Sequence, residues 1–370
     1  MSSATVRERF RAAALFRKAG ALPRFEAMGF WDQTLARWRT EGLPADRSPW
    51  EFFGLEQFMD NAPAGIAYHT DRVISNAYWP PFEELTLEET AEYRVARLAD
   101  GIVARELKGG TSVPQFIEYP LRGEQDWPAI RERLDPNLPE RYSEVPSVAA
   151  QTRGRAYVLR FGICGAYGFL RNLFGPEQLC YALYDAPQFI HRLLDHWVHF
   201  NCSLADRLCP AIDFDYVFLW EDMAYKNGPL LSPAHFRLFI LPRYKELIAH
   251  LRRRHGLDLF MVDSDGDNWE LLPLFIEGGV NIFTPLEIAA GMEPLELRRR
   301  FPELVLLGGI DKRALLAGGQ ATRAELERGV PELLAQGGYF PCLDHHVPAD
   351  VSFEAFCQYL EMLRAIEAQG

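Results

Sequence analysis

The second half of the chain alternates short apolar segments with longer segments in which apolar residues recur every three or four positions. The short segments are apolar on both faces, as strands are when helices cover a parallel sheet. Their order predicts successive strand–helix units. The predicted strands are Tyr157–Gly162, Asp215–Trp220, Asp258–Val262, Val280–Thr284, Leu304–Leu307 and Tyr339–Leu343.

Capping residues bound several of the predicted helices. A Ser or Asp before the first turn can accept a hydrogen bond from a free backbone N–H group, and proline is favoured in that turn. Such starts are Asp185 before a helix to about Leu208, Ser232-Pro233 before a helix to about Arg254, and Ser352 before the last helix.

Together these elements predict an α/β fold, a single (β/α)8 barrel. Eight strands close such a barrel, so two further strands are expected before residue 150, with Pro49–Leu55 as one candidate. Residues 1–45 are expected to form helices packed on the barrel, which would occupy residues 46–370.

One segment of the barrel is expected to be an insertion. Residues 101–119 predict a β-hairpin, with strands Ile102–Leu107 and Val113–Tyr119 around Lys108-Gly109-Gly110. An antiparallel hairpin and an exposed aromatic residue such as Trp79 lead us to expect a homodimer.

Composition narrows the class of protein. The chain has 370 residues, 48% hydrophobic and 24% charged, and a net charge of −12, which argues against nucleic-acid binding because that requires a basic surface. Six scattered cysteines without a CxxC pair predict reduced thiols. No apolar run approaches the ~20 residues of a membrane span, and no apolar core of a secretion signal is visible, so we expect a cytoplasmic protein.

The first candidate site is an acidic segment at the end of a predicted strand. Asp263 and Asp265 follow Met261-Val262, and alternation would put them on one side of the chain. Catalytic groups of barrels lie at such strand ends. Asp263 and Asp265 are therefore candidate catalytic residues, and Asp267 is expected mainly to cap the next helix.

The second candidate follows the last strand, in Asp344-His345-His346. In an extended chain adjacent side chains point to opposite sides, so we expect only His345 to face the first acidic segment. A lone histidine is often structural, but this one follows a terminal strand. His346 is an additional candidate for substrate binding.

Two further loops carry polar residues after predicted strands. One offers Glu221 as a catalytic candidate, with Asp222, Tyr225 and Lys226 for substrate binding, and an ion-paired structural loop is the alternative. In the other, glycine backbone N–H groups and nearby charges could hold an anion, and a tight turn with a helix cap is the alternative. The candidates there are Gly308, Gly309, Asp311 and Lys312.

In this order these segments resemble the uroporphyrinogen decarboxylase superfamily, in particular an uncharacterised branch related to corrinoid-linked zinc methyltransferases. The resemblance rests on Leu231-Ser232-Pro233, on Pro242-Arg243-Tyr244, on Gly308-Gly309-Ile310-Asp311 and on the histidine loop leading to Glu354. It implies a barrel enzyme. True decarboxylases of the family carry an N-terminal RQAGR-type motif and an FSDIL-type motif, and this chain has neither, so the chain is expected not to be one.

The methyltransferases of the superfamily hold zinc with a His-x-Cys pair and a later cysteine. At the corresponding positions this chain has Asp263 and Asp265, with His345 near the third and Cys342 three residues earlier. Two carboxylates and an imidazole make a harder site, which suits Zn, Mn or Fe. Alternatively no metal binds, and the acids and His345 exchange protons with a substrate.

Three functions are open from the sequence. The first is methyl transfer from a small O- or N-methyl donor to a corrinoid protein, with or without a divalent metal. The second is a metal-free decarboxylase or lyase that acts on a porphyrinogen-like or other polycarboxylate. The third is a non-catalytic barrel that binds a tetrapyrrole or corrinoid.

Overall fold

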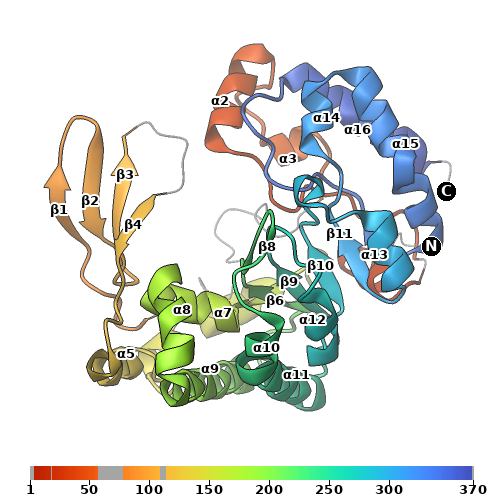
Figure 1. Ribbon diagram of the computed structural model, residues 1–370. Coiled ribbons are helices and arrows are strands. Elements are labelled where there is room, and N and C mark those ends of the chain that lie inside the picture. The colour runs from red at the N-terminus through yellow and green to blue at the C-terminus, as the bar shows by residue number, and fades with distance from the viewer. Residues whose placement is uncertain (1–3, 18, 57–77, 109–113, 369–370) are drawn as a thin grey trace.

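The protein is described by a computed structural model, which covers residues 4–17, 19–56, 78–108 and 114–368 (Figure 1). Its centre is a six-stranded parallel sheet of order β12-β11-β10-β9-β6-β5. Each strand overlaps a predicted one, so all six predicted strands are confirmed. They are β5 (Arg160–Cys164), β6 (Tyr216–Trp220), β9 (Phe260–Asp263), β10 (Ile282–Thr284), β11 (Val305–Leu307) and β12 (Tyr339–Phe340).

Helices follow the strands and cover the outer face of the sheet (Figure 1). Ser232 caps the first turn through its side chain, as its sequence position predicts, and Gly256 ends the helix with a left-handed φ of 68°. The helices are α7 (Ala166–Phe174), α8 (Pro176–Asp185), α9 (Pro187–Leu208), α10 (Pro233–His235), a π-helical turn (Phe236–Ile240), α11 (Leu241–His255), α12 (Leu272–Gly278), α13 (Pro294–Arg300), α14 (Lys312–Leu316), α15 (Gly319–Gln336) and α16 (Phe353–Glu367).

The two faces of the sheet bury two separate apolar clusters. The larger cluster lies between the strands and the helices. The smaller one takes alternate residues of the strands, among them Phe218, Met261 and Leu307, and is joined by Phe10 of α1 (Val6–Ala14). Since alternate residues point to opposite faces, this second cluster is the interior of the barrel, and α1 contributes to it.

A segment near the N-terminus lies beside β12, where a further strand of the barrel would stand. Phe25 and Ala27 belong to the interior cluster. The backbone N–H of Leu343 donates to Glu26 Oε2 at 2.9 Å, and Phe30 forms a parallel bridge with Val347. The segment therefore extends the curved sheet beyond its last regular strand.

Two sequence expectations are wrong. Pro49–Leu55, expected to be a strand, contains the helix α3 (Pro49–Phe52), with Ser48 at its N-cap and Pro49 in its first turn. Asp185 ends α8, and Ala186, not Asp185, is the N-cap of α9.

The parallel sheet in the described part of the chain has six strands, so the two extra strands expected before residue 150 are not found there.

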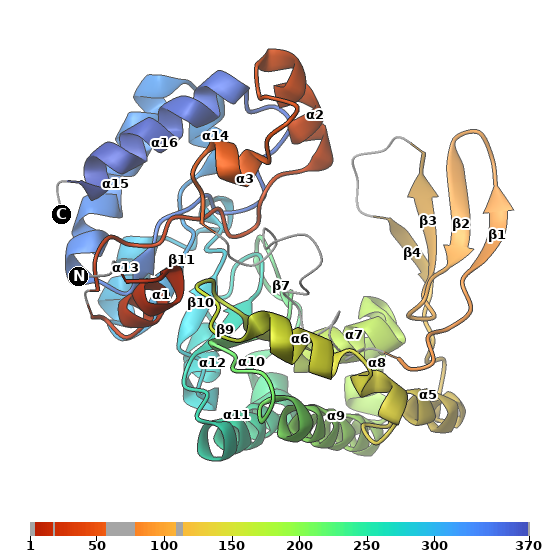
Figure 2. The same cartoon turned by 180° about the vertical axis from the view of Figure 1, so that it is seen from behind.

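A second, antiparallel sheet projects from the side of the barrel in both views (Figures 1 and 2). Its strands are β1 (Leu85–Glu89), β2 (Tyr93–Arg97), β3 (Val103–Leu107) and β4 (Gln115–Glu118). Strands β3 and β4 pair as the hairpin predicts, while residues 109–113 of its turn lie outside the described residues. Strands β1 and β2 were not predicted, and Trp79 is only partly exposed.

The helices of the first half surround these sheets. Helix α2 (Asp32–Glu41) contacts α16, and the Trp38 indole N–H donates to Val351 O at 2.8 Å. The division into residues 1–45 and 46–370 remains a prediction. Helices α5 (Trp127–Arg133) and α6 (Val145–Thr152) precede β5. None of the helices described is both long and apolar enough to cross a membrane.

Candidate active site

Polar side chains gather where the parallel strands end, on loops that follow β9, β10, β11 and β12. We call the set Asp263, Asp265, Thr284, Glu287, Lys312, Asp344 and His345 the strand-end cluster. Active sites of barrels lie at this end because the loops after the strands converge there.

Asp263 is the last residue of β9 and is 7% exposed. It has the same parity as Met261, an interior residue, so its side chain points into the end of the barrel. Its neighbour in register is Thr284 of β10. Thr284 Oγ1 is buried and has no hydrogen-bond partner within the described chain.

Asp265 and His345 form an ion pair across the end of the barrel. Oδ2 of Asp265 lies 3.3 Å from Nε2 of His345. Burial lowers the pKa of the His345 imidazole, but the hydrogen bond and the charge of Asp265 outweigh burial, and the pKa is raised above its ordinary value. The other carboxylate oxygen, Oδ1 of Asp265, is buried and lacks a hydrogen-bond partner among the residues described. The His345 imidazole thus lies beside an acceptor that a ligand could use.

The two adjacent histidines do not point apart as an extended chain would require. Their Nδ1 atoms are 3.4 Å apart, and the His346 ring stacks on Trp31 with 4.5 Å between centroids. The loop after β12 is not extended, so alternation does not apply. His346 therefore lies against His345, and the N-terminal Trp31 belongs to the same surroundings.

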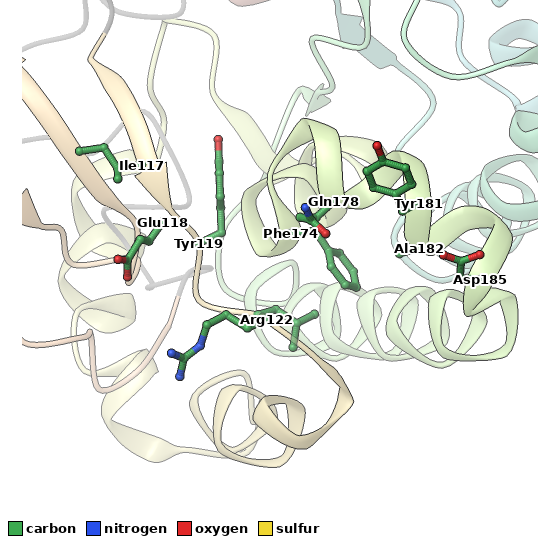
Figure 3. Close-up of a pocket in the computed structure, with 10 residues that line it drawn as sticks. Ile117, Glu118, Tyr119, Arg122, Phe174, Gln178, Tyr181, Ala182 and Asp185 are labelled. Atoms are coloured by element: carbon green, nitrogen blue, oxygen red, sulfur yellow. The ribbon is translucent and has the colours of Figure 1, made fainter.

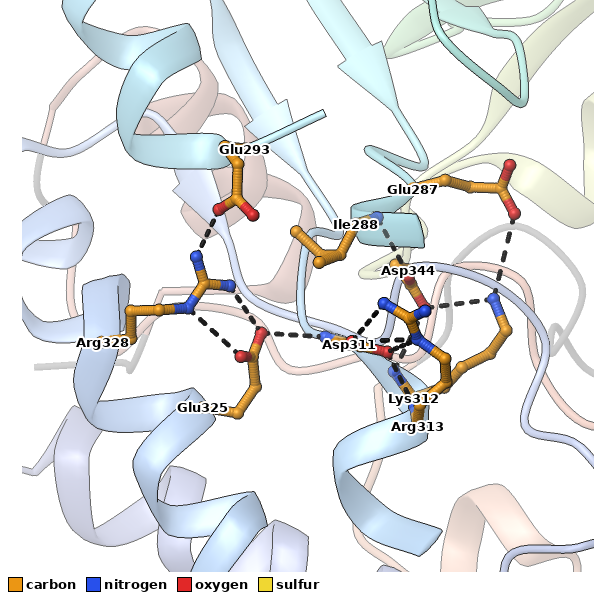
Figure 4. Close-up of polar contacts among 9 residues, drawn as sticks. All are labelled: Glu287, Ile288, Glu293, Asp311, Lys312, Arg313, Glu325, Arg328 and Asp344. Atoms are coloured by element: carbon orange, nitrogen blue, oxygen red, sulfur yellow. Dashed lines mark hydrogen bonds and ion pairs between the residues drawn. The ribbon is translucent and has the colours of Figure 1, made fainter. Parts of the chain in front are cut away.

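Lys312 is held between two acids of the strand-end cluster (Figure 4). Its Nζ is 3.2 Å from Asp344 Oδ1 and 3.9 Å from Glu287 Oε1. Glu287 also accepts from the Gly266 N–H at 2.9 Å. Burial raises the pKa of Glu287, and the charge of Asp265 raises it further. Acids therefore outnumber cations in these contacts.

Asp311 has a local structural role. Its side chain caps α14 through Arg313 N and pairs with the Arg313 guanidinium, while its own N–H donates to Glu325 at 3.1 Å (Figure 4). Asp311 thus belongs to an ion network that continues through Glu325 to Arg328, away from Lys312.

The two glycines before Asp311 are required by packing. The Gly308 N–H donates to Phe340 O and the Gly309 N–H to Pro285 O, at 3.1 and 3.2 Å. Both have left-handed φ, and a Cβ on Gly308 would lie 2.0 Å from Pro285 O. Their N–H groups are already used inside the protein, so the hydrogen bonds favour the tight-turn alternative over the anion-binding one.

Glu221 follows β6 but faces the helices. It is fully buried, and its carboxylate accepts from the N–H groups of Ala166, Tyr167 and Gly168 at the start of α7. The Tyr244 hydroxyl donates to it at 2.5 Å. Burial raises the pKa of Glu221 to about 7 although these hydrogen bonds lower it. In this structure Glu221 caps a helix.

The remaining candidates lie on the loop after β6. Asp222 has a φ of 47° and pairs with Arg171, whose Nη1 is 2.8 Å from Asp222 Oδ2. Tyr225 lies in a short hairpin, β7 (Ala224–Tyr225) with β8 (Gly228–Pro229), and is 62% exposed. Lys226 is exposed in its turn. The Asp267 N–H donates to Tyr225 O at 2.9 Å, so this hairpin rests on the acidic loop after β9.

The predicted metal ligands do not form a compact set. A compact set would have one ligand atom from each residue within 4.8 Å of the other two. Asp263, Asp265 and His345 do not meet this condition, although another group in the described chain does. Asp265 is instead paired with His345. Cys342 is fully buried in the barrel, burial holds the pKa of its thiol well above the ordinary value, and it does not join a compact ligand group among the residues described. The arrangement suits proton exchange better than a three-ligand metal centre.

A separate hollow of about 540 Å³ lies between the end of β4 and helices α7 and α8 (Figure 3). None of the candidate residues lines it. Its walls are Ile117, Glu118, Tyr119, Leu121, Arg122, Phe174, Gln178, Tyr181, Ala182 and Asp185.

Sequence reasoning missed three members of this end of the barrel. Glu287 follows β10 just as Asp265 follows β9, so the position rule that selected Asp265 would also have selected Glu287. Thr284 ends its strand and could have been found in the same way. Trp31 carries no such signal, since its place beside His346 depends on how the N-terminal segment folds back.

Comparison with known proteins gives a family and a fold. The chain covers 99% of a solved methyltransferase from Methanosarcina mazei, over 99% of its own length, with a TM-score of 0.63 and 14% identity, which shows a common fold. No curated protein matches its sequence. The family model described as uroporphyrinogen decarboxylase matches residues 106–366, which is most of the sequence. Taken with the parallel sheet that curves around its own apolar interior, this match means that the chain belongs to the uroporphyrinogen decarboxylase family, whose fold is a (β/α) barrel.

Proposed function

We propose that this protein transfers a methyl group from a small O- or N-methyl donor to a corrinoid carried by a partner protein, with His345 and Asp265 as the proton-donating pair. The observation that carries the proposal is the contact of 3.3 Å between these residues at the ends of two barrel strands. The acceptor is inferred from the resemblance to corrinoid-linked methyltransferases and from the shared fold.

Transfer from an O-methyl donor requires an acid. When a methyl group leaves an O-methyl donor, the carbon–oxygen bond breaks and the oxygen keeps the electron pair, so it must gain a proton. The raised pKa of His345 keeps its imidazole protonated closer to neutral pH, and Asp265 orients it. A reduced corrinoid would supply the electron pair that forms the new bond to the methyl carbon. An O-methyl donor leaves as an alcohol after gaining this proton, whereas a quaternary or protonated N-methyl donor leaves as a neutral amine and needs no proton.

The charges of the strand-end cluster favour a neutral or cationic donor. Asp265, Glu287 and Asp344 are balanced only in part by His345 and by Lys312, which is already paired with two acids. A polycarboxylate would have to approach these carboxylates in a site of low dielectric, where repulsion is strong. The same charges therefore weigh against the polycarboxylate decarboxylase of the sequence analysis.

Two buried polar atoms without partners in the described chain offer contacts to the donor. They are Asp265 Oδ1, which accepts, and the Thr284 hydroxyl, which can donate or accept. A donor that forms hydrogen bonds to both atoms removes the cost of burying them without partners in the free enzyme. No step of this reaction uses a metal ion, because Asp263, Asp265 and His345 do not form a compact ligand set.

The proposal is tested by incubating the purified protein with reduced free cobalamin and a panel of aryl methyl ethers, methylamines and quaternary methylammonium compounds. Methyl transfer is followed by the visible spectrum of the corrinoid, and carbon dioxide release from polycarboxylates is measured in parallel. We expect transfer with a neutral or cationic donor and, for the aryl methyl ethers, a loss of at least a hundredfold in His345→Ala, in line with the usual worth of general acid catalysis. Asp267→Asn is the matched control, since its carboxylate only accepts from Trp269 N.

If carbon dioxide is released and no methyl group is transferred, methyl transfer is wrong and the decarboxylase of the sequence analysis is supported. Corrinoid binding without turnover, unchanged in Asp265→Asn, would support the non-catalytic barrel. A homodimer and a cytoplasmic location remain expectations, and light scattering of the purified protein tests the first.

A further inference from the structure

Two histidines and an aspartate converge at the ends of two neighbouring helices, away from the strand-end cluster. Asp206 lies in the last turn of α9, and His250 and His255 lie in the last two turns of α11. Helices of a βα barrel run opposite to its strands, so their C-terminal ends lie at the amino ends of the strands. This group is therefore at the opposite end of the barrel from Asp265 and His345.

The two imidazoles converge on one carboxylate oxygen of Asp206. Nε2 of His250 and Nε2 of His255 lie 2.8 and 2.7 Å from the same oxygen, Asp206 Oδ1. One ligand atom from each residue lies within 4.8 Å of the other two, and no other such group exists in the described residues. The His255 side chain is 6% exposed, while His250 and Asp206 are about a quarter and a third exposed. The group is thus ordered by burial yet reachable from solvent.

We propose that Asp206, His250 and His255 bind a divalent transition-metal ion such as Zn²⁺, which would join the C-terminal ends of α9 and α11. Two imidazole nitrogens and one carboxylate oxygen are a common protein ligand set for zinc, with water in the fourth position. Metal–ligand bonds of about 2.0–2.2 Å require the present contacts to open by only a fraction of an ångström.

The crowding of one oxygen supports a cation at this point. Besides the two imidazoles, Arg254 Nε lies 3.0 Å from Asp206 Oδ1. A carboxylate oxygen has two lone pairs, so three donors cannot all make good hydrogen bonds to it. An ion bound by Oδ1 and by both imidazole nitrogens removes this competition. Each imidazole nitrogen then binds the ion through its lone pair and no longer donates a hydrogen bond to Oδ1.

Local electrostatics help and oppose binding. The free carbonyl groups at the C-terminal ends of α9 and α11 favour a positive charge. Burial raises the pKa of Asp206, but the hydrogen bonds from His250 and His255 outweigh burial and lower it, so the carboxylate is ionised. Arg254 competes for this carboxylate, but its side chain is 66% exposed and can move into solvent.

Nearby cysteines do not change the ligand set. Cys202 on α9 and Cys209 at its C-cap flank Asp206, and burial raises the pKa of each thiol to about 12. Neither belongs to the compact group of ligand atoms. The expected site therefore has two nitrogens and one oxygen, and Co²⁺, a divalent ion of the same series as Zn²⁺, serves as its spectroscopic probe.

The test is titration of the metal-free full-length protein with Zn²⁺ by calorimetry and with Co²⁺ by visible absorption. We expect one ion per chain, a Co²⁺ spectrum typical of four or five ligands, and a rise in Tm on adding Zn²⁺, because an ion that binds only the folded chain stabilises it. His255→Ala and His250→Ala should each weaken binding at least tenfold. Circular dichroism checks folding, and the partly exposed His250 keeps the test valid if His255→Ala does not fold.

Two controls separate this site from others. Arg254→Ala should bind the ion as well as or better than the wild type, since it removes a competitor. Asp265→Asn should leave binding unchanged, because that residue lies at the other end of the barrel. If no ion binds, the three residues form only a hydrogen-bonded network and the proposal is wrong. It is equally wrong if binding survives both histidine variants.

Discussion

Replacing Gly308 with alanine tests whether the glycine pair after β11 serves packing or ligand binding. Gly308 has a φ of 107°, a conformation that costs an L-residue about 1–2 kcal/mol. Its added Cβ would lie 2.0 Å from the carbonyl oxygen of Pro285, although real Cβ atoms almost never come within 3.0 Å of another atom. The backbone of Pro285 would have to move by about 1 Å, and overpacking of this kind costs about 1–3 kcal/mol or more.

The same movement would weaken the hydrogen bond from the Gly309 N–H to Pro285 O, which is worth about 1 kcal/mol. We therefore expect Gly308→Ala to lower the free energy of unfolding by about 4 kcal/mol or more. The matched control is Gly291→Ala. Gly291 also has a left-handed φ, 82°, but a Cβ there would meet nothing within 4 Å, so only the conformational cost of about 1–2 kcal/mol applies.

Urea unfolding of the two variants, followed by circular dichroism and tryptophan fluorescence, measures the difference between them. Equal losses of stability would refute the packing argument, because the close contact with Pro285 would then carry no cost. If Gly308→Ala were as stable as the control yet lost affinity for anionic ligands, the anion-binding interpretation of the sequence would be restored.

Three further predictions concern individual carboxylates. Asp265→Asn should lower the pKa of the His345 imidazole, because burial lowers this pKa and the charge of Asp265 no longer opposes it. An NMR titration measures the pKa, and an unchanged value would show that the pair is not formed. Burial raises the pKa of Glu26 to about 7, above its value in the unfolded chain, so its contribution to stability is full below about pH 4.5 and is lost as the pH rises through 7. The wild type should therefore lose about 3 kcal/mol relative to Glu26→Gln between pH 5 and 8, measured by urea unfolding at each pH, and a constant difference would contradict the raised pKa. Glu221→Gln should cost about 1–3 kcal/mol in unfolding experiments, since an amide NH₂ would face backbone N–H donors of α7, whereas unchanged stability would mean that the cap is dispensable.

The parallel strands could be predicted because each is buried on both faces. Strand β9 is fully buried along its length, and β6 nearly so, so each appears as an uninterrupted apolar run in a chain that is otherwise mixed. Strand β1, in contrast, is exposed at all five residues, and its sequence Leu-Thr-Leu-Glu-Glu has no buried face to mark it. The strand expected after Ser48 is instead a helix, because Ser48 and Pro49 favour a helix start.

The positions of the candidate site residues could be predicted, but their partners could not. Asp265 and His345 each follow a strand, and all strands of a parallel barrel end on one side, so the two were expected to meet. Which acid pairs with Lys312, or which ring stacks on His346, depends on loops and on an N-terminal segment that are distant in sequence. Such contacts have no local signal, so the pairing of Lys312 with Glu287 and Asp344 and the stacking of Trp31 on His346 emerge only from the structure.

The end of β6 shows how little separates a structural carboxylate from a catalytic candidate. Trp220 packs toward the barrel interior, and its partner in register is Asp263, which points the same way. Glu221 is one residue further on, so its side chain turns to the helix layer, where α7 and Tyr244 bind it. Both acids stand at the ends of apolar strands, and composition cannot distinguish them. Counting residues from the interior positions of each strand distinguishes them, so parity along the strand is the first criterion for sorting these acids into a helix cap and a candidate catalyst.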